Sequence, residues 1–146
     1  MVLDATNAMR VQLDSSDQPV QPVSFTDLVA VTFEDGTLRA TGPGGWGTAG
    51  AYSEQSIAGD GFVSFIANGG RYMIGLTGDN PNPSAHYSTI DHAIFIHSPS
   101  TLQIYENGSN KGDFFYTSGD RLAVVRTGTT VEYYNLTADA LNPFYT

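Results

Sequence analysis

Residues 44–134 decide the fold of this chain, and their blocks read GGWGTAGAYSEQSI (44–57), GDGFVSFIA (59–67), RYMIGLT (71–77), IDHAIFIH (90–97), TLQIYENG (101–108) and GDRLAVVRTGTTVEYY (119–134). Each block is a short apolar run rich in Tyr, Phe, Ile and Val, and Gly, Asn, Asp or Pro separates it from the next. Aromatic and β-branched residues favour strands, and no block keeps a helical period for long. The sequence therefore predicts an all-β chain.

Turn residues divide the chain into its expected strands. Asp35-Gly36, Asn107-Gly108 and Gly128 are residues that tolerate the positive φ of tight hairpins. We expect strands at 28–33, 37–41, 51–57, 62–67, 72–77, 90–97, 102–106, 112–116, 121–126 and 130–136. Residues 78–88 hold two prolines and should form a surface loop. Two packed antiparallel sheets, each of about five to seven strands, would account for this pattern.

The order of the blocks resembles the concanavalin A-like, LamG- or lectin-like modules that are repeated in bacterial extracellular proteins. Their successive motifs are GW-x-x-GA-x-S-x-Q, GD-G-aromatic-V-x-F, R-x-x-GL, ID-x-AI, YENG and GD-x-L-x-V. They correspond to residues 45–55, 59–65, 71–76, 90–94, 105–108 and 119–124 of this chain, which has one residue more than the motif between Trp46 and Gly50 and between Arg71 and Gly75. The resemblance implies a two-sheet antiparallel β-sandwich, a concanavalin A-like jelly roll. It implies less about a ligand, because one fold serves many functions.

The length of 146 residues suits one domain. We expect residues 24–146 to form the sandwich module and residues 1–23 to form an N-terminal strand, arm and linker. Within the arm, residues 9–13 alternate like a strand and residues 14–22 form a polar connector. The arm could be an ordinary first strand of the sandwich, could pair with the edge of its own sheet, or could pair with a neighbouring subunit.

Composition removes several classes of function. The formal net charge is −9, and the 6 Lys and Arg residues are scattered singly, so nucleic acid and anionic membranes are poor partners. No apolar run is long enough to span a bilayer, so we expect no membrane insertion. The chain lacks cysteine, which excludes disulfides and thiolate chemistry. We expect an extracellular, cell-surface or virion location.

We predict no catalytic residue and no enzymatic activity. Retaining glycosidases place two carboxylates about 5 Å apart, whereas Glu54, Glu106 and Glu132 each stand alone in their strands and Asp91 has no carboxylate neighbour. A glycan hydrolase or lyase would require carboxylates from separate strands, such as Glu54 and Glu106, to meet in one groove.

The histidines do not suggest a metal site either. His92 and His97 are five residues apart in one expected strand, which places them on opposite faces. His92 alternates in phase with Ile94 and Ile96, and we expect it to be half-buried beside a polar neighbour. No cofactor is required. Calcium is a possible exception, because Asp79, Asn80 and Asn82 offer oxygen ligands in one short loop.

Glycan binding is the chemistry for which the chain is best supplied. A sugar ring stacks its apolar face on an aromatic side chain, while amides, carboxylates and imidazoles bind its hydroxyls. The candidate ligand-binding residues are Trp46, Tyr72, His86, Tyr87, Asp91, Tyr105 and Asn107. The same aromatic residues could instead serve only the packing of the sandwich.

The sequence favours a non-catalytic, lectin-like module that binds carbohydrate or mediates adhesion. Its partners would be glycans or a surface receptor, and repeated copies would strengthen weak sites. The alternative is a structural subunit of a phage virion or cell-surface filament. In that case the sandwich and the N-terminal arm would mediate assembly, as a homo-oligomer or with a neighbouring subunit.

Overall fold

The computed structural model describes residues 2–3, 21–42, 45–78 and 86–146. This part of the chain is an antiparallel β-sandwich with one short 3₁₀ helix, η2 (Tyr87–Thr89). The predicted all-β class is confirmed.

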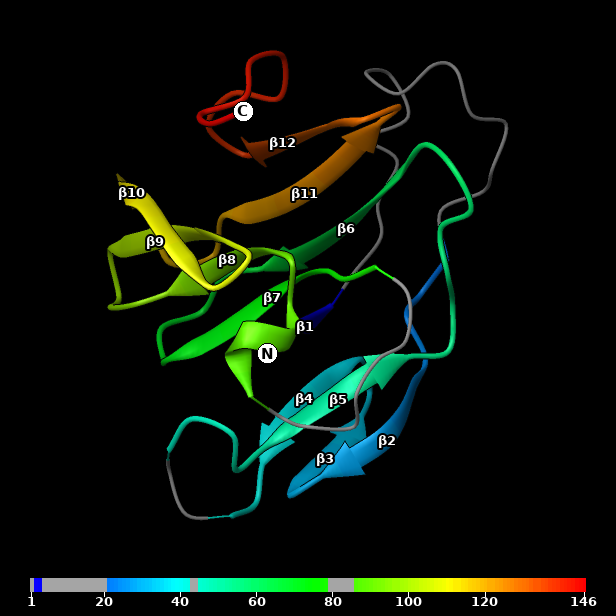
Figure 1. Ribbon diagram of the computed structural model, residues 1–146. Helices are drawn as coiled ribbons and strands as arrows, with labels where there is room; N and C mark the ends of the chain where they lie inside the picture. The colour runs from blue at the N-terminus through cyan, green and yellow to red at the C-terminus, as the bar shows by residue number, and fades with distance from the viewer. Residues whose placement is uncertain (1, 4–20, 43–44, 79–85) are drawn as a thin grey trace.

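The described residues form three antiparallel sheets (Figure 1). The six-stranded sheet has the order β12 (Thr130–Asn135), β11 (Arg121–Thr127), β6 (Gly61–Ile66), β1 (Val2–Leu3), β4 (Thr37–Ala40) and β3 (Val31–Glu34). The four-stranded sheet has the order β10 (Ser109–Phe115), β9 (Thr101–Glu106), β8 (His92–Ile96) and β7 (Tyr72–Leu76). The two-stranded sheet pairs β2 (Phe25–Val29) with β5 (Gly50–Ser53).

The core lies between the six-stranded and four-stranded sheets. Ile74, Ile94 and Ile104 stand opposite one another across β7, β8 and β9, and all three are buried. They belong to one cluster with side chains of the facing sheet, namely Phe65, Leu122, Val124 and Tyr133. Each fully buried aliphatic side chain contributes roughly 1.5–3 kcal/mol. Because side chains alternate along a strand, the face that carries these apolar residues points inward and the other face points outward.

Two hairpins have the turns that the sequence predicts. Asp35 and Gly36 have φ of 49° and 72°, and Asn107 and Gly108 have φ of 49° and 76°. Two successive positive φ values define the type I′ turn, whose twist matches that of the flanking strands. These predictions are confirmed.

One expected strand is instead two strands in different sheets. The segment 28–33 breaks at Ala30, whose φ is 46°, and Asp27 within β2 has φ of 48°. A positive φ in a residue with a side chain interrupts the extended backbone. The chain bends there, so β2 pairs with β5 and β3 pairs with β4. The third sheet was not expected, and this bend is its cause.

The expected strand at 51–57 is also shorter, because β5 ends at Ser53. The Ser53 hydroxyl donates to the carbonyl of Gln55 at 2.8 Å, which turns the chain. The Gln55 side chain then accepts from the Ser24 amide and donates to the Pro22 carbonyl. These bonds attach the chain after β5 to the segment before β2.

The beginning of the chain joins an internal position of the six-stranded sheet. Val2 and Leu3 form β1, which pairs with β6 on one side and β4 on the other. These two residues of the expected arm therefore do not lie at a sheet edge. The strand expected at 9–13 lies outside the described residues.

Tyr133 joins the two large sheets through a buried hydroxyl. The side chain has no exposed surface, and its hydroxyl donates to Glu106 Oε1 of β9 at 3.2 Å and lies 3.4 Å from His92 Nδ1 of β8. Burial, followed by the nearby Glu106 carboxylate, raises the pKa of Tyr133 far above its ordinary value. The hydroxyl therefore stays protonated and remains a donor.

We expect Tyr133→Phe to lower the free energy of unfolding by about 1–2 kcal/mol, because Glu106 loses a buried donor. Urea unfolding measures the loss. Tyr134→Phe is the matched control, since the Tyr134 hydroxyl donates to Glu132 of its own strand, at 3.2 Å, and not to the facing sheet among the described residues. Equal losses in the two variants would contradict a special role for the bond between the sheets.

Candidate functional site

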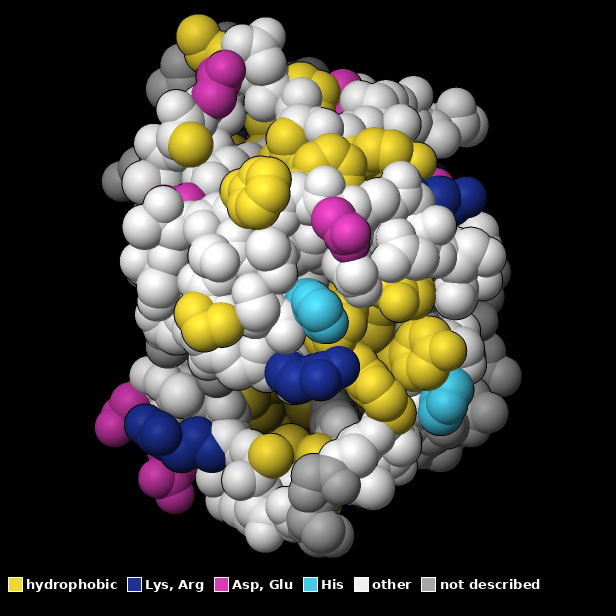
Figure 2. Space-filling view, turned by 90° about the vertical axis from the view of Figure 1, so that its left-hand side faces the viewer, with side chains coloured by type: hydrophobic (Ala, Val, Ile, Leu, Met, Phe, Trp, Pro, Cys, Tyr) yellow, Lys and Arg dark blue, Asp and Glu magenta, His cyan; other side chains and the backbone are white. Residues whose placement is uncertain are grey.

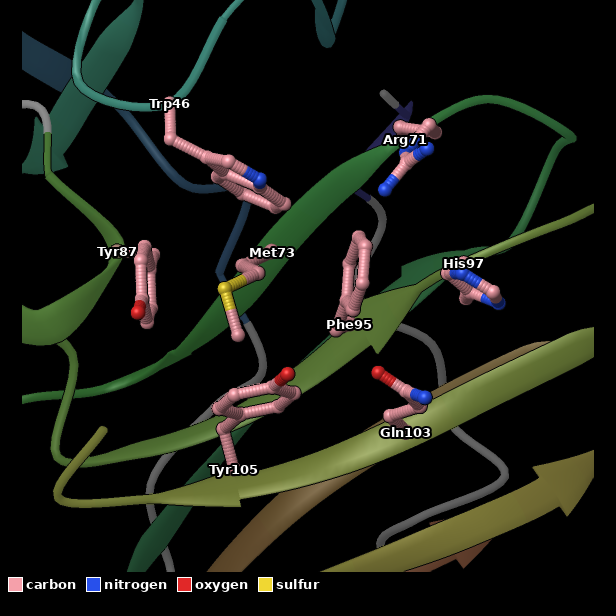
Figure 3. A pocket seen from close by; sticks show the side chains of 8 residues that line it. All are labelled: Trp46, Arg71, Met73, Tyr87, Phe95, His97, Gln103 and Tyr105. Atoms are coloured by element: carbon pink, nitrogen blue, oxygen red, sulfur yellow. The ribbon is translucent and has the colours of Figure 1, made fainter. Parts of the chain in front are cut away.

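A pocket of about 260 Å³ lies on the outer face of the four-stranded sheet (Figure 3). It is lined by Trp46, Arg71, Met73, Tyr87, Phe95, His97, Gln103 and Tyr105. Figure 2 shows this side of the molecule, where hydrophobic side chains gather beside basic and histidine side chains.

Strand register places the floor of the pocket. Met73, Phe95 and Gln103 stand opposite one another on β7, β8 and β9. Each precedes or follows a core isoleucine by one residue, so each points away from the core. Tyr105 follows two positions after Gln103, and its cross-strand neighbours in the same row are Ala93 and Gly75. These small residues leave space beside the Tyr105 ring.

Two loops add Trp46 and Tyr87. Gly47 follows Trp46 with φ of 82°, and a Cβ there would lie 3.4 Å from the His86 ring, so glycine suits this position. The Thr48 hydroxyl donates to the Gly45 carbonyl at 2.7 Å and closes the turn around Trp46. Tyr87 begins η2, which is held by a 2.8 Å bond from the Thr77 hydroxyl to the Thr89 carbonyl.

Four aromatic rings contact one another in a closed circuit. The Trp46 centroid lies 5.0 Å from that of Phe95 and 5.3 Å from that of Tyr87. The Tyr105 centroid lies 6.0 Å from both Tyr87 and Phe95. All four pairs meet edge to face, and such a pair contributes about 0.5–1.5 kcal/mol beyond its buried area. Phe95 is 4% exposed and Trp46 is 46% exposed, so the circuit has a buried base and an open rim.

The polar groups of the pocket lie on one side of this circuit. The Gln103 amide donates from Nε2 to Asp113 Oδ1 at 2.6 Å, and its carbonyl oxygen is turned toward the pocket (Figure 3). The Arg71 guanidinium carbon lies 5.8 Å from the Phe95 centroid, within the range of a cation–π contact. The His97 ring centroid is 5.4 Å from that of Phe95. An acceptor, a cation and an imidazole thus face the same space.

The structure brings three of the predicted ligand-binding residues together in the pocket: Trp46, Tyr87 and Tyr105. His86 lies next to them, with its ring centroid 4.6 Å from that of Tyr87. Its Nδ1 is 2.8 Å from the Ser88 hydroxyl, which orients the ring.

The other predicted ligand-binding residues lie elsewhere and have local partners. Tyr72 packs on the core side of β7, where its hydroxyl donates to the Asn68 carbonyl at 2.9 Å. Asp91 Oδ2 accepts from the Gly78 amide at 2.7 Å, and Asn107 forms the hairpin turn. The residues predicted for calcium, Asp79, Asn80 and Asn82, lie outside the described residues.

Sequence reasoning did not identify Arg71, Met73, Phe95, His97 and Gln103 as lining one site. The available signal was alternation, because Met73, Phe95 and Gln103 each adjoin an inward-facing isoleucine in the sequence. Alternation shows which residues share a face, but only the pairing register shows that they are neighbours.

The predicted placement of His92 and His97 on opposite faces of one strand is confirmed. His92 lies near Tyr133 on the core side, whereas His97 lines the outer pocket, so the two are on opposite faces. In the ranges that the structure covers, no three His, Asp or Glu residues are grouped to hold a metal ion. Glu54 follows β5 in the two-stranded sheet, and Glu106 is bonded to Tyr133 and lies 3.8 Å from Lys111 Nζ.

Comparisons with protein-family models, with curated proteins and with solved structures give no match to this chain. Among the described residues, no helix has the length and apolar character needed to cross a membrane.

The raised pKa values of the tyrosines predict that the protein becomes less stable at alkaline pH. Burial raises the pKa of Tyr72 from 10.0 to about 12, and burial is also the main cause of the raised pKa values of Tyr116 and Tyr134. The unfolded chain therefore loses these protons at lower pH than the folded protein does. We expect unfolding free energy to be unaffected by these groups below pH 10 and to fall between about pH 10 and pH 12.

Denaturant unfolding at several alkaline pH values checks this, together with tyrosinate absorbance of the folded protein. Tyr72→Phe should reduce the slope in that window. Titration of every tyrosine in one step near pH 10 would refute the expected burial.

Proposed function

We propose that this chain is a non-catalytic, lectin-like module that binds carbohydrate outside the cell. The aromatic pocket formed by Trp46, Tyr87, Phe95 and Tyr105 carries this proposal. Its open rim presents aromatic surface to solvent, and the C–H face of a pyranose is the natural partner of such a surface. The Gln103 carbonyl oxygen is an acceptor for a sugar hydroxyl.

The size of the pocket fits a small part of a glycan. Its volume of about 260 Å³ is below the ~300–1,000 Å³ typical of pockets for drug-sized ligands. A single terminal sugar residue suits this space. Binding at one such site would be weak, and repeated copies of the module would raise the avidity.

The sequence blocks add independent support. Their order resembles concanavalin A-like modules, and Trp46, Arg71 and Tyr105 belong to three of these blocks. All three residues line the pocket. We therefore extend the proposal to a jelly-roll module of that kind.

One observation favours a second candidate, a structural subunit of a virion or surface filament. Phe115 is 86% exposed at the end of β10, an edge strand of its sheet. An exposed aromatic on an edge strand can form a contact between subunits. Lys111 and the bulge between Asn110 and Gly112 work against extended pairing along the same strand.

A glycan array, run with and without calcium, tests the proposed site. We expect the chain to retain a related set of sugars, and Tyr105→Ala and Trp46→Ala to weaken binding about tenfold through lost stacking. Circular dichroism and urea unfolding establish that each variant remains folded.

Phe115→Ser is the matched control, because it removes an exposed aromatic from the same sheet outside the pocket. It should leave glycan binding unchanged. Absence of glycan retention, together with a large assembly in light scattering that Phe115→Ser dissociates, would reject the carbohydrate site in favour of the structural subunit.

A further inference from the structure

Arg71 brings a positive charge to the pocket that no acidic side chain neutralises in the part of the chain that the structure describes. The ion pairs there join Glu106 to His92 and to Lys111, at 3.7 and 3.8 Å. The contact that holds Arg71 is the one with the Phe95 ring, and its side chain is exposed. Its N–H donors are therefore available to a ligand.

The charge of the chain makes this position informative. With 15 acidic and 6 basic residues, the chain has a net charge of −9. Acidic side chains outnumber basic ones by more than two to one, so composition alone would favour an acidic side chain at the pocket. The pocket instead has Arg71, which forms no ion pair with a described acidic residue. Lys111, by comparison, pairs with Glu106, and Arg126 Nε donates to the Gly128 carbonyl at 3.1 Å.

The pocket is polar at one end and aromatic at the other. Arg71 directly precedes Tyr72, and His97 directly follows Ile96, which is paired with Tyr72. Arg71 and His97 therefore lie at the same end of the sheet, and Figure 3 shows Tyr87 and Tyr105 at the opposite end of the pocket. A ligand that is apolar on one face and anionic at one end would match both parts.

We propose that the ligand is an acidic saccharide whose carboxylate or sulfate group binds Arg71 while its ring stacks within the aromatic circuit. This inference rests on the proposed carbohydrate site. A guanidinium presents planar, paired N–H donors that match the oxygens of both anions. The contact with the Phe95 ring holds the exposed guanidinium beside the pocket.

Asp113 limits where the anionic group can bind. Its carboxylate is bonded to the Gln103 amide and lies on β10, one strand beyond the pocket floor. Repulsion from Asp113 disfavours an anion beside Gln103. The Arg71 and His97 end is therefore the place for the anionic group, and the Gln103 carbonyl oxygen is left for a hydroxyl.

Matched pairs of glycans test the inference. The array carries glucuronate-, galacturonate- and sialate-terminated oligosaccharides beside their methyl esters, and sulfated oligosaccharides beside their desulfated forms. We expect the retained glycans to be acidic and to bind about tenfold more tightly than their neutral partners. Comparison of the carboxylate and sulfate pairs identifies which anion Arg71 recognises. Added salt should reduce the difference in affinity between each acidic glycan and its neutral partner.

Arg71→Gln should reduce the ratio of acidic to neutral affinity to near one, with the affinity for the neutral partner changed less than twofold. Arg71→Lys should keep part of the ratio, because it keeps the charge and loses the paired donors. Arg39→Gln is the control, since it removes an equal charge from β4 outside the pocket lining. This variant should leave the ratio of acidic to neutral affinity unchanged.

The failures of the two proposals are distinguishable. Equal retention of acidic and neutral partners, still dependent on Trp46, would overturn the acidic ligand and leave the carbohydrate site standing. A ratio that Arg71→Gln does not change would also overturn the role of Arg71. Absence of any glycan retention would overturn both.

Discussion

The inner face of the four-stranded sheet is packed against β6, β11 and β12, and the rest of the structure depends on this contact. Ile74, Ile94 and Ile104 form one row of apolar side chains that is stabilised by burial. The side chains of Phe65 and Tyr133 on the facing sheet shield this row from water. Because side chains alternate along a strand, burial of this row also determines the outward row. The same register that builds the core therefore builds the floor of the pocket.

The pocket is formed by a floor of paired strands and by two loops. Met73, Phe95 and Gln103 lie on strands whose partners fix their spacing, so the pairing of the sheet is enough to form the floor. Trp46 and Tyr87 come from segments with little regular structure, and edge-to-face contacts with the floor and with each other hold their rings.

The two faces of the four-stranded sheet differ in whether their charged side chains have partners of opposite charge. On the inner face, Glu106 has a hydroxyl donor from Tyr133 and is close to Lys111, so its charge is compensated within the protein. On the outer face, the Arg71 guanidinium lies over an aromatic ring, and no described carboxylate forms an ion pair with it. Compensated charge stabilises the fold, whereas uncompensated charge at a pocket is available for recognition.

The sequence by itself determined the all-β class, the two Asx-Gly hairpins and the opposite faces of His92 and His97, because these follow from local φ preference and from alternation. It also identified Trp46, Tyr87 and Tyr105 as chemically suited to a ligand. The break at Ala30 and the separate β2–β5 sheet were not readable, since alanine has no local preference for a positive φ. Only the tertiary structure decided that Arg71, Phe95 and Gln103 share one pocket and that Tyr72 faces the core. These are consequences of register between strands, and register depends on long-range burial, which no local run of residues specifies.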